Sequence, residues 1–444
     1  MPASDALKAR INAAIDGRGE YVVGIAKQIL RTPEYGYRET YAAGLVADAF
    51  REAGIAYRDG IAITGVKAVL DTGRPGPTVG VIGELDSIGA RGHEFANPET
   101  GAAHACGHHC QIGSMLGAGL GLLDSGALDQ MSGRVVLIAV PAEEYVEIEY
   151  RLSLRREGKI EFLVGKNEMI RLGELDDVDM AMMTHASSQP EDRQLAVGMT
   201  SNGMVAKFIR YTGKASHAGG APHLGINALG AAHVALAAIH AQRETFRDDD
   251  HVRVHPIITK GGDLVSVIPA DVRMETFVRA STPEAIEAAC VKVDRALRAG
   301  AMAMGARLDV TTIPGYLPLR HDARMSALYR ANATTLVGAE NVGTPSHRTG
   351  GTDMGDLSQI MPVIHPVAGG ATGPSHSDDF NIVDYDLAVV KAAKGMALTV
   401  ADLLANDASE ARAVLQEHKP PMTKAQYLAF VRRLAADETY QGDK

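Results

Sequence analysis

The stretch AAHACGHHC, residues 102–110, holds three histidines and two of the chain's three cysteines. Side chains of these types could form a disulfide, hold a structural metal ion or supply part of an active site. Cys106 and His108 can both face one ion if the backbone is extended, whereas residues two apart on a helix point away from each other. We therefore predict a loop here. For this pair alone, a buried thiol beside a helix-cap histidine is the simpler interpretation.

Two adjacent carboxylates follow a short apolar run at residues 134–142, RVVLIAVPA. Neighbouring glutamates at a strand end can divide the work, because one can bind a metal ion while the other takes a proton from water. An ordinary solvated pair is the alternative for Glu143 and Glu144. Their place directly after a predicted strand favours the chemical interpretation.

Four separated segments share this setting. HACGHH, PAEEY, MMTH ending at His185 and PSHSDDF containing His376 lie where an α/β sheet would present the ends of its strands. Thiolate, imidazole and carboxylate are ligands that Zn²⁺, Mn²⁺ and related divalent ions accept. The pattern indicates a hydrolytic metal site rather than a disulfide.

The elements that must position these residues form an α/β pattern. Residues 5–54 predict two helices, and the apolar runs at 78–85 and 134–142 predict strands around a helix that covers 115–126. Strands alternating with helices are typical of a mixed or parallel sheet flanked by helices.

The pattern changes near residue 200. Strands are predicted at 204–213, 252–262, 272–281 and 307–313, and helices at 225–243 and 283–305. This order predicts a small α+β, ferredoxin-like domain inserted at 200–313 into a catalytic domain made of 1–199 and 314–444.

Bulk properties exclude several classes of function. The chain has 444 residues, a formal charge of −10 and no run of about 20 apolar residues. An acidic chain without a basic cluster does not favour nucleic acid, and the absence of a long apolar run does not favour a membrane span. The first residues lack the apolar centre of a secretion signal, so we expect a cytoplasmic protein.

Six motifs in order resemble the M20 family of metallopeptidases and amidohydrolases. They are HACGHH, PAEEY, GKASHAGGAPHLGINAL, SVIPADV, GGTDMGDLS and PSHSDDF. The cysteine in the first motif and the GGTDMGDLS segment are similar to the branch of aminoacylases and aminobenzoyl-glutamate hydrolases. The resemblance covers nearly the whole chain.

This resemblance implies a role for each motif residue. Glu143 would be the general base, and Asp86 would fix the orientation of a ligand histidine. Mn²⁺ or Zn²⁺ is implied, with one or two ions per subunit. His104 and His109 would support the site only indirectly. The implied metal ligands are Cys106, His108, Glu144, His185 and His376.

The inserted domain would contribute to substrate binding and to assembly. In the family, the histidine that corresponds to His217 reaches the partner subunit's site and stabilises the developing oxyanion, which implies a homodimer. Arg279 would clamp a substrate carboxylate. A turn histidine and a surface salt bridge are the alternatives for these two residues.

The chain departs from the family after its glutamate pair, where YVEIEYRLSLRREGKIEFLVGKNEMIRLG replaces a short glycine-rich turn. Ser266 also stands where asparagine is common. The expected substrate is a small, aromatic, carboxylate-bearing molecule. Hydrolysis of an amide such as aminobenzoyl-glutamate and deamination of an aromatic amine such as 5-nitroanthranilate are the candidate reactions.

Two other functions remain open at this point. One is a non-catalytic protein on the same fold that binds a metal or a small molecule, and a purified protein that is metal-free and indifferent to chelators would favour it. A cysteine nucleophile at Cys106, activated by His108, would work without metal. The presence of the base and of all five implied ligands favours the metal-dependent hydrolase over both.

Overall fold

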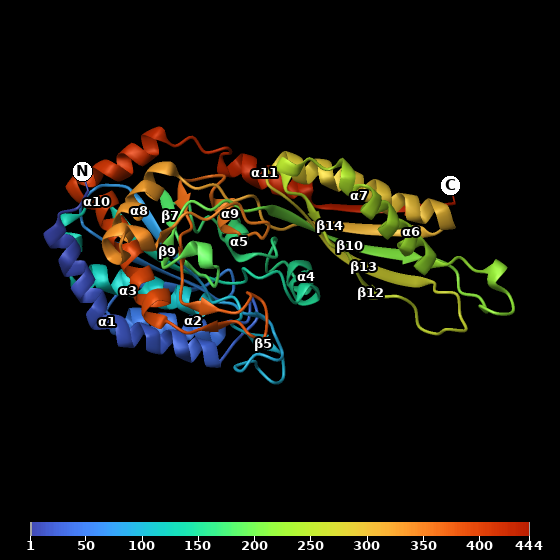
Figure 1. Cartoon of the computed structure of the whole chain (residues 1–444), viewed down its shortest axis with the longest axis horizontal. Coiled ribbons are helices and arrows are strands. Elements are labelled where there is room, and N and C mark those ends of the chain that lie inside the picture. Colours follow the sequence, from blue (N-terminus) through green and yellow to red (C-terminus); the bar gives the residue numbers. More distant parts are fainter. Residues whose placement is uncertain (1, 444) are drawn as a thin grey trace. The chain divides into compact units, whose positions relative to one another are not determined.

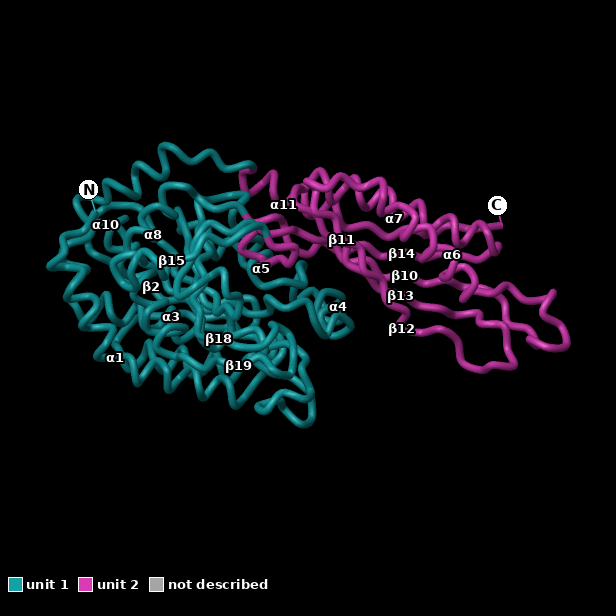
Figure 2. The backbone as a smooth tube through the Cα atoms, in the orientation of Figure 1, with its two compact units in different colours: residues 1–200, 320–347, 356–421 teal, residues 201–319, 348–355, 422–444 magenta. Residues whose placement is uncertain are grey.

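The computed structural model describes residues 2–443, which divide into two compact units (Figures 1 and 2). Among these residues, unit 1 comprises 2–200, 320–347 and 356–421, and unit 2 comprises 201–319, 348–355 and 422–443. Unit 2 therefore extends beyond the predicted insertion at 200–313 and takes in the C-terminal residues. The predicted α/β class is confirmed.

Unit 1 is built on a mixed six-stranded sheet in the order β1-β2-β6-β3-β7-β16. Strand β3 pairs in parallel with β6 and β7, whereas β2 is antiparallel to β6. Their bounds are β1 Tyr57–Ile61, β2 Gly65–Asp71, β3 Thr78–Glu84, β6 Arg134–Val140, β7 Met180–Met182 and β16 Val363–Ile364.

The two central strands β3 and β6 are almost wholly buried, as expected for strands with helices on both faces. Helix α3 packs against β3, and α1 and α10 pack against α3 (Figure 1). The bounds of the principal helices are α1 Asp5–Arg31, α2 Thr40–Glu52, α3 His108–Asp124, α8 Ala323–Val337 and α10 Ala392–Glu417.

Two smaller parts of unit 1 matter for the site. The segment after the glutamate pair folds into helices α4 (Ile148–Arg156) and α5 (Gly165–Leu172). A second, four-stranded sheet has the order β15-β9-β17-β8. Its strand β8, His185–Ala186, begins with His185, one of the predicted metal ligands. Its other strands are β9 Leu195–Ala196, β15 Val342–Gly343 and β17 Val367–Ala368.

Unit 2 is an antiparallel sheet in the order β11-β13-β10-β14-β20, with β12 also paired to β13. Helices α6 and α7 pack against each other and against the sheet. Strand β14, which covers the strand predicted at 307–313, pairs with β10 on one side and with the C-terminal strand β20 on the other. The bounds are β10 Gly203–Thr212, α6 Ala228–Ala241, β11 Arg253–Val254, β12 Ile257–Lys260, β13 Asp271–Ala280, α7 Pro283–Met304, β14 Arg307–Pro314, α11 Lys424–Leu434 and β20 Ala436–Gln441.

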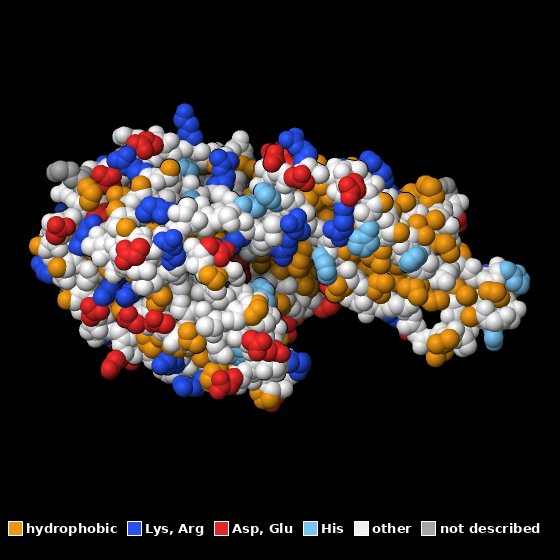
Figure 3. Space-filling view, viewed as in Figure 1, with side chains coloured by type: hydrophobic (Ala, Val, Ile, Leu, Met, Phe, Trp, Pro, Cys, Tyr) orange, Lys and Arg blue, Asp and Glu red, His pale blue; other side chains and the backbone are white. Residues whose placement is uncertain are grey.

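Unit 2 exposes several large apolar side chains. They lie on α6, α7 and β12, at Leu224 and in the loop after β12, and Figure 3 shows apolar side chains across the visible face of this unit. Val265 is fully exposed and Leu264 is 65% exposed. Contiguous apolar surface of this kind marks contact sites. Among residues 2–443, no helix is both long and apolar enough to cross a bilayer.

Candidate metal centre

The candidate site lies beyond the carboxyl ends of the parallel strands β3, β6 and β7. Strand β3 leads into Asp86, β6 leads into the glutamate pair, and β7 leads into His185. Because these strands run in the same direction, their ends meet at one edge of the sheet. The sheet therefore gathers side chains that are far apart in the sequence.

Gly107 shapes the HACGHH segment. It adopts a left-handed conformation, φ +93°, at the N-cap of α3, and a Cβ there would lie 3.1 Å from that of Ala186. The prediction of a loop at both flanking residues is thus wrong for His108, which is the first residue of α3. The left-handed residue turns the backbone between Cys106 and His108, so both side chains can face one point.

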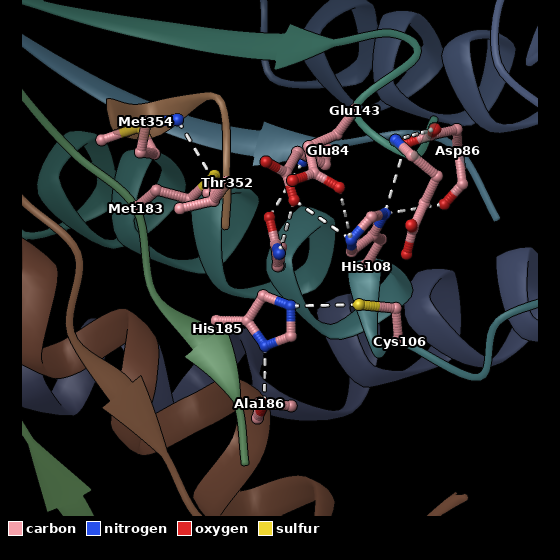
Figure 4. Close-up of polar contacts among 12 residues, drawn as sticks. Glu84, Asp86, Cys106, His108, Glu143, Met183, His185, Ala186, Thr352 and Met354 are labelled. Atoms are coloured by element: carbon pink, nitrogen blue, oxygen red, sulfur yellow. Dashed lines mark hydrogen bonds and ion pairs between the residues drawn. The ribbon is translucent and has the colours of Figure 1, made fainter. Parts of the chain in front are cut away.

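A first group of donors, the histidine cluster, consists of Cys106, His108 and His185, with ligand atoms within 4.8 Å of one another. Cys106 Sγ is 3.3 Å from His185 Nε2. Figure 4 shows these two side chains pointing toward each other, with His108 close by. The Nδ1 atom of His185 lies 2.6 Å from the carbonyl oxygen of Ala186, which leaves Nε2 facing the cluster.

A second group, the glutamate cluster, consists of Cys106, Glu144 and His376, also within 4.8 Å of one another. His376 Nε2 is 3.1 Å from Glu144 Oε1. The backbone N–H of His376 donates to the carbonyl of Ala105 at 2.8 Å, and its φ of +66° is rare for a residue with a Cβ. Cys106 belongs to both clusters.

The glutamate pair is aimed by its backbone. Ala142 has φ +55°, and its N–H donates to Glu39 Oε1 at 2.7 Å. The N–H of Glu144 donates to Asp86 Oδ2 at 2.8 Å. This turn leaves Glu143 Oε2 3.9 Å from His108 Nε2. Both glutamates are buried to the same extent, at 6% exposure.

Asp86 holds both sides of the site together. Its main-chain carbonyl lies 2.9 Å from His108 Nδ1, and its carboxylate accepts the N–H of Glu144. The side chain is fully buried. An Nδ1–H that donates to Asp86 leaves the Nε2 lone pair of His108 for an ion, which is the arrangement that supporting residues give to ligand histidines.

Several buried residues at the site were not predicted from the sequence. Glu84 and Gln111 contact each other, Lys166 pairs with Glu84, and Arg151 lies 4.0 Å from Asp86. The sequence could have indicated Glu84 as a site residue, because this carboxylate ends a predicted apolar strand two residues before Asp86. No local pattern in the sequence indicates Lys166 or Arg151, because they belong to α5 and α4 and reach the site only through tertiary packing.

The charges of the clusters favour protons on their imidazoles. Burial lowers the pKa of His108, but Cys106 and Glu84 outweigh it and raise the pKa well above its usual value. Burial likewise lowers the pKa of His376, and contacts with Cys106 and Glu144 raise it to about 11. The clusters therefore stabilise positive charge at the positions where a cation would lie.

The thiol and the carboxylate are shifted toward their charged forms. Burial and Glu144 raise the pKa of Cys106, while His108 and His185 bring it down to about 6. Burial raises the pKa of Glu144, but His376 lowers it to about 2. A thiolate and an ionised carboxylate are the forms that bind metal ions.

These donors fit a divalent ion. Thiolate, imidazole and carboxylate are the types that Zn²⁺ and its neighbours accept. Within residues 2–443, the buried Nε2 of His108 has no hydrogen-bond partner. Such an atom is costly to bury unless it binds something. The fit therefore rests on this buried nitrogen, which faces the carboxylates of Glu84 and Glu143, as well as on the donor types.

His104 and His109 belong to neither cluster. Burial and the charge of His109 lower the pKa of His104, and burial with the charge of His108 lowers that of His109 to about 3. Both are therefore neutral. His109 Nε2 lies 3.3 Å from the hydroxyl of Tyr385, so this ring contacts a neighbouring side chain and not the ligand clusters.

His217 and Arg279 lie in unit 2. His217 is exposed, and its Nδ1 accepts the backbone N–H groups of Gly219 and Gly220 at 3.1 and 2.9 Å. This fixes the proton on Nε2, which can donate a hydrogen bond outward. Arg279 lies on β13, and its guanidinium is 5.2 Å from the ring centre of Phe277.

Comparison with protein families identifies one region of the chain. Residues 200–303 match the family model of the M20 peptidase dimerisation domain. The match coincides with the core of unit 2, from β10 to α7.

Related sequences are hydrolases. The Xaa-Arg dipeptidase of Mus musculus is 26% identical over 421 residues, which are 90% of this chain and 89% of that protein. One component of the p-aminobenzoyl-glutamate hydrolase of Escherichia coli is 30% identical over 232 residues, 49% of this chain and 48% of that one. The indole-3-acetyl-aspartic acid hydrolase of Enterobacter agglomerans is 30% identical over 232 residues, with shares of 50% and 48%.

Solved structures share the fold along most of the chain. A dinuclear metal-binding M20 peptidase of Bacillus subtilis aligns with a TM-score of 0.64 and 19% identity, over 88% of this chain and 99% of that one. An aminobenzoyl-glutamate utilization protein from Klebsiella pneumoniae aligns with a TM-score of 0.66 and 18% identity, over 88% and 98%.

Proposed function

We propose that this chain is a metal-dependent hydrolase of the M20 family, which its dimerisation domain and its related sequences support, and that it cleaves a C–N bond in a small, aromatic, carboxylate-bearing molecule. The observation that carries this proposal is the pair of donor clusters that share Cys106, with the Glu143 carboxylate directed at the same place. The proposed ligands are Cys106, His108, His185, Glu144 and His376.

The metal is proposed to be Zn²⁺ or Mn²⁺, and two ions per subunit suit two clusters. The thiolate of Cys106 favours Zn²⁺, whereas Glu144 and the imidazoles suit both ions. When bound, a divalent ion lowers the pKa of a water molecule to about 7 and polarises the group under attack.

Glu143 is the proposed general base. Its Oε2 takes one proton from the attacking water and passes that proton to the leaving nitrogen. The attacked carbon receives the hydroxyl of the water, and the nitrogen receives its proton. The buried turn at Ala142 fixes the direction of this carboxylate. His217 Nε2–H would stabilise the oxyanion, and Arg279 would bind the substrate carboxylate through a bidentate pair.

The His217 role implies a homodimer in which each unit 2 serves the partner's site. The dimerisation domain at residues 200–303 and the apolar surface on α6 and β12 support this assembly. His217 is exposed and already oriented to donate, as a residue that acts on another protomer must be.

Amide hydrolysis is the first candidate reaction. Two relatives are named for amides of an aromatic acid with an acidic amino acid, aminobenzoyl-glutamate and indole-3-acetyl-aspartate. A carboxylate-bearing substrate of this type would use Arg279. The leaving nitrogen would belong to an amino acid.

Aromatic deamination, such as that of 5-nitroanthranilate, is the second candidate. The observation that favours it is Tyr145, which follows the glutamate pair and is 8% exposed. It brings a ring where relatives have a glycine-rich turn, and a ring can stack on an aromatic substrate. Water would then attack an electron-poor ring carbon, and ammonia would leave.

A substrate panel tests the proposal and separates its two forms. Metal-loaded protein is incubated with aryl amides, N-acyl amino acids and nitroanilines, and released ammonia and amines are quantified. Free amino acid identifies an amidase, and ammonia from an aromatic amine identifies a deaminase. A protein that binds no metal and turns over no member of the panel would contradict the proposal.

A further inference from the structure

A third group of donors lies around the Nε2 nitrogen of His108. Glu84, His108 and Glu143 offer ligand atoms within 4.8 Å of one another. Glu84 Oε2 lies 3.2 Å from His108 Nε2, closer than Glu143 Oε2 at 3.9 Å. Figure 4 shows Glu84 and His108 directed toward each other. None of the sequence motifs assigned a role to Glu84.

Glu84 is held rigidly in this position. Its backbone N–H donates to Gln111 Oε1 at 3.1 Å, and Gln111 Nε2 donates back to Glu84 Oε2 at 2.8 Å. Lys166 Nζ pairs with the other oxygen, Oε1. A carboxylate has about four lone-pair positions, so Oε2 keeps one that is not used by these partners.

The contact between Glu84 and His108 brings two electron-rich atoms together. His108 Nδ1 lies 2.9 Å from the carbonyl of Asp86, so a proton on Nδ1 donates to that oxygen and Nε2 is the nitrogen that faces Glu84. That atom is buried and has no hydrogen-bond partner within residues 2–443. A carboxylate oxygen and an imidazole lone pair at 3.2 Å repel unless a proton or a metal cation lies between them.

Lys166 makes a third carboxylate tolerable in this buried place. Both Lys166 and Glu84 are at most 1% exposed. Burying an unpaired carboxylate would be costly, and an ammonium group on its far oxygen offsets much of that cost. The near oxygen can then serve a second cation.

We propose that Glu84 is a further ligand of the divalent ion that His108 holds, and that Lys166 is its charge partner. The inference rests on the proposed function only in that the centre binds a metal. It adds a carboxylate to the histidine cluster and makes the α5 segment part of the metal centre.

The test measures metal binding rather than turnover. Wild type, Glu84→Gln and Glu168→Gln are loaded with Co²⁺, and affinity is measured by competition with a chromogenic chelator. Glu168 is a suitable control, because it is a buried carboxylate paired with a cation, Arg171, and it belongs to none of the three donor groups. The visible Co²⁺ spectrum reports coordination number in each protein.

We expect Glu84→Gln to weaken the binding of one ion by about 100-fold or more, since loss of a supporting partner alone costs about 10–100-fold. Its Co²⁺ bands should change in position and intensity, while those of Glu168→Gln match wild type. An unchanged spectrum in Glu84→Gln, whatever its affinity, would overturn ligation by Glu84.

Glu84→Gln leaves Lys166 buried without its partner, which can prevent folding. The double variant Glu84→Gln/Lys166→Met removes both charges, and the same spectral change is expected there. A double variant with the wild-type spectrum would overturn the inference. Because metal binding is measured without substrate, altered binding in a protein that fails the substrate panel would leave this inference standing and reject only the proposed function.

Discussion

The carboxylate of Glu39 accepts a 2.7 Å hydrogen bond from the backbone N–H of Ala142, the residue that precedes the proposed base. Its other oxygen accepts from the hydroxyl of Thr64. Glu39 is fully buried, and Ala142 has the unusual φ of +55°. A carboxylate from the start of α2 thus fixes the turn that aims Glu143 and Glu144.

Glu39 should make stability depend on pH. Burial and the charge of Asp86 raise the pKa of Glu39 to about 8, from an ordinary value of 4.5. Between these values the folded chain keeps a proton that the unfolded chain loses, so this contribution to stability is full below pH 4.5 and is lost as pH rises to about 8. Melting temperatures of metal-free protein at about pH 5 to 9 should show this fall in wild type. They should show a smaller fall in Glu39→Gln, and identical profiles would contradict the assignment.

Replacement of the proposed base should abolish turnover without releasing metal. Glu143→Gln keeps the size of the side chain but cannot take a proton, and loss of a general base costs about 10²–10⁴-fold in rate. Activity is measured with the substrate that the panel identifies, and metal content is measured by mass spectrometry. Full turnover by Glu143→Gln would reject its role as base.

Metal removal should lower both activity and stability. Chelation should abolish turnover, and Zn²⁺ or Mn²⁺ should restore it. An ion that binds only the folded chain stabilises it by about 2.7 kcal/mol at 100 times its dissociation constant, so the melting temperature should rise on reloading. Calorimetry with and without added ion measures this shift. Activity that survives exhaustive chelation would favour the cysteine nucleophile instead.

Arg151 should be essential to the fold around the site. It is fully buried, donates to the carbonyl of Leu163 at 2.8 Å and lies over the ring of Tyr37. Arg151→Ala should lower the free energy of unfolding by about 3–5 kcal/mol, because it removes one partner of buried charges. The exposed Arg155 of the same helix is the control, and Arg155→Ala should change stability by no more than about 0.5 kcal/mol. Equal denaturation midpoints for the two variants would contradict this role.

Complementation can test whether His217 acts on the partner protomer. Glu143→Gln and His217→Ala should each be inactive as homodimers. When the two are co-expressed, a hybrid dimer has one site with an intact Glu143 and an intact His217 from the other chain, so activity should reappear. Hybrids isolated with two affinity tags provide the measurement. Hybrids as inactive as the parents would show that His217 does not act across the dimer.

Local patterns in the sequence determined much of the architecture. Apolar runs with β-branched residues correctly predicted β3 and β6, and helical spacing predicted α6 and α7 close to their observed bounds. These features depend on neighbours within a few residues, which the sequence displays directly. The residue types at predicted strand ends also indicated where donors for a metal would gather.

Only the tertiary structure decided how those donors are supported. His108 begins a helix because Gly107 adopts a left-handed conformation. Strand β20 pairs with β14, although more than a hundred residues separate the two strands in the sequence. Glu84, Lys166, Glu39 and Arg151 meet the site through contacts between distant segments, and no local periodicity encodes such contacts. Residue types thus specified the kind of chemistry, whereas burial and long-range pairing fixed the charges and directions of the groups that would perform it.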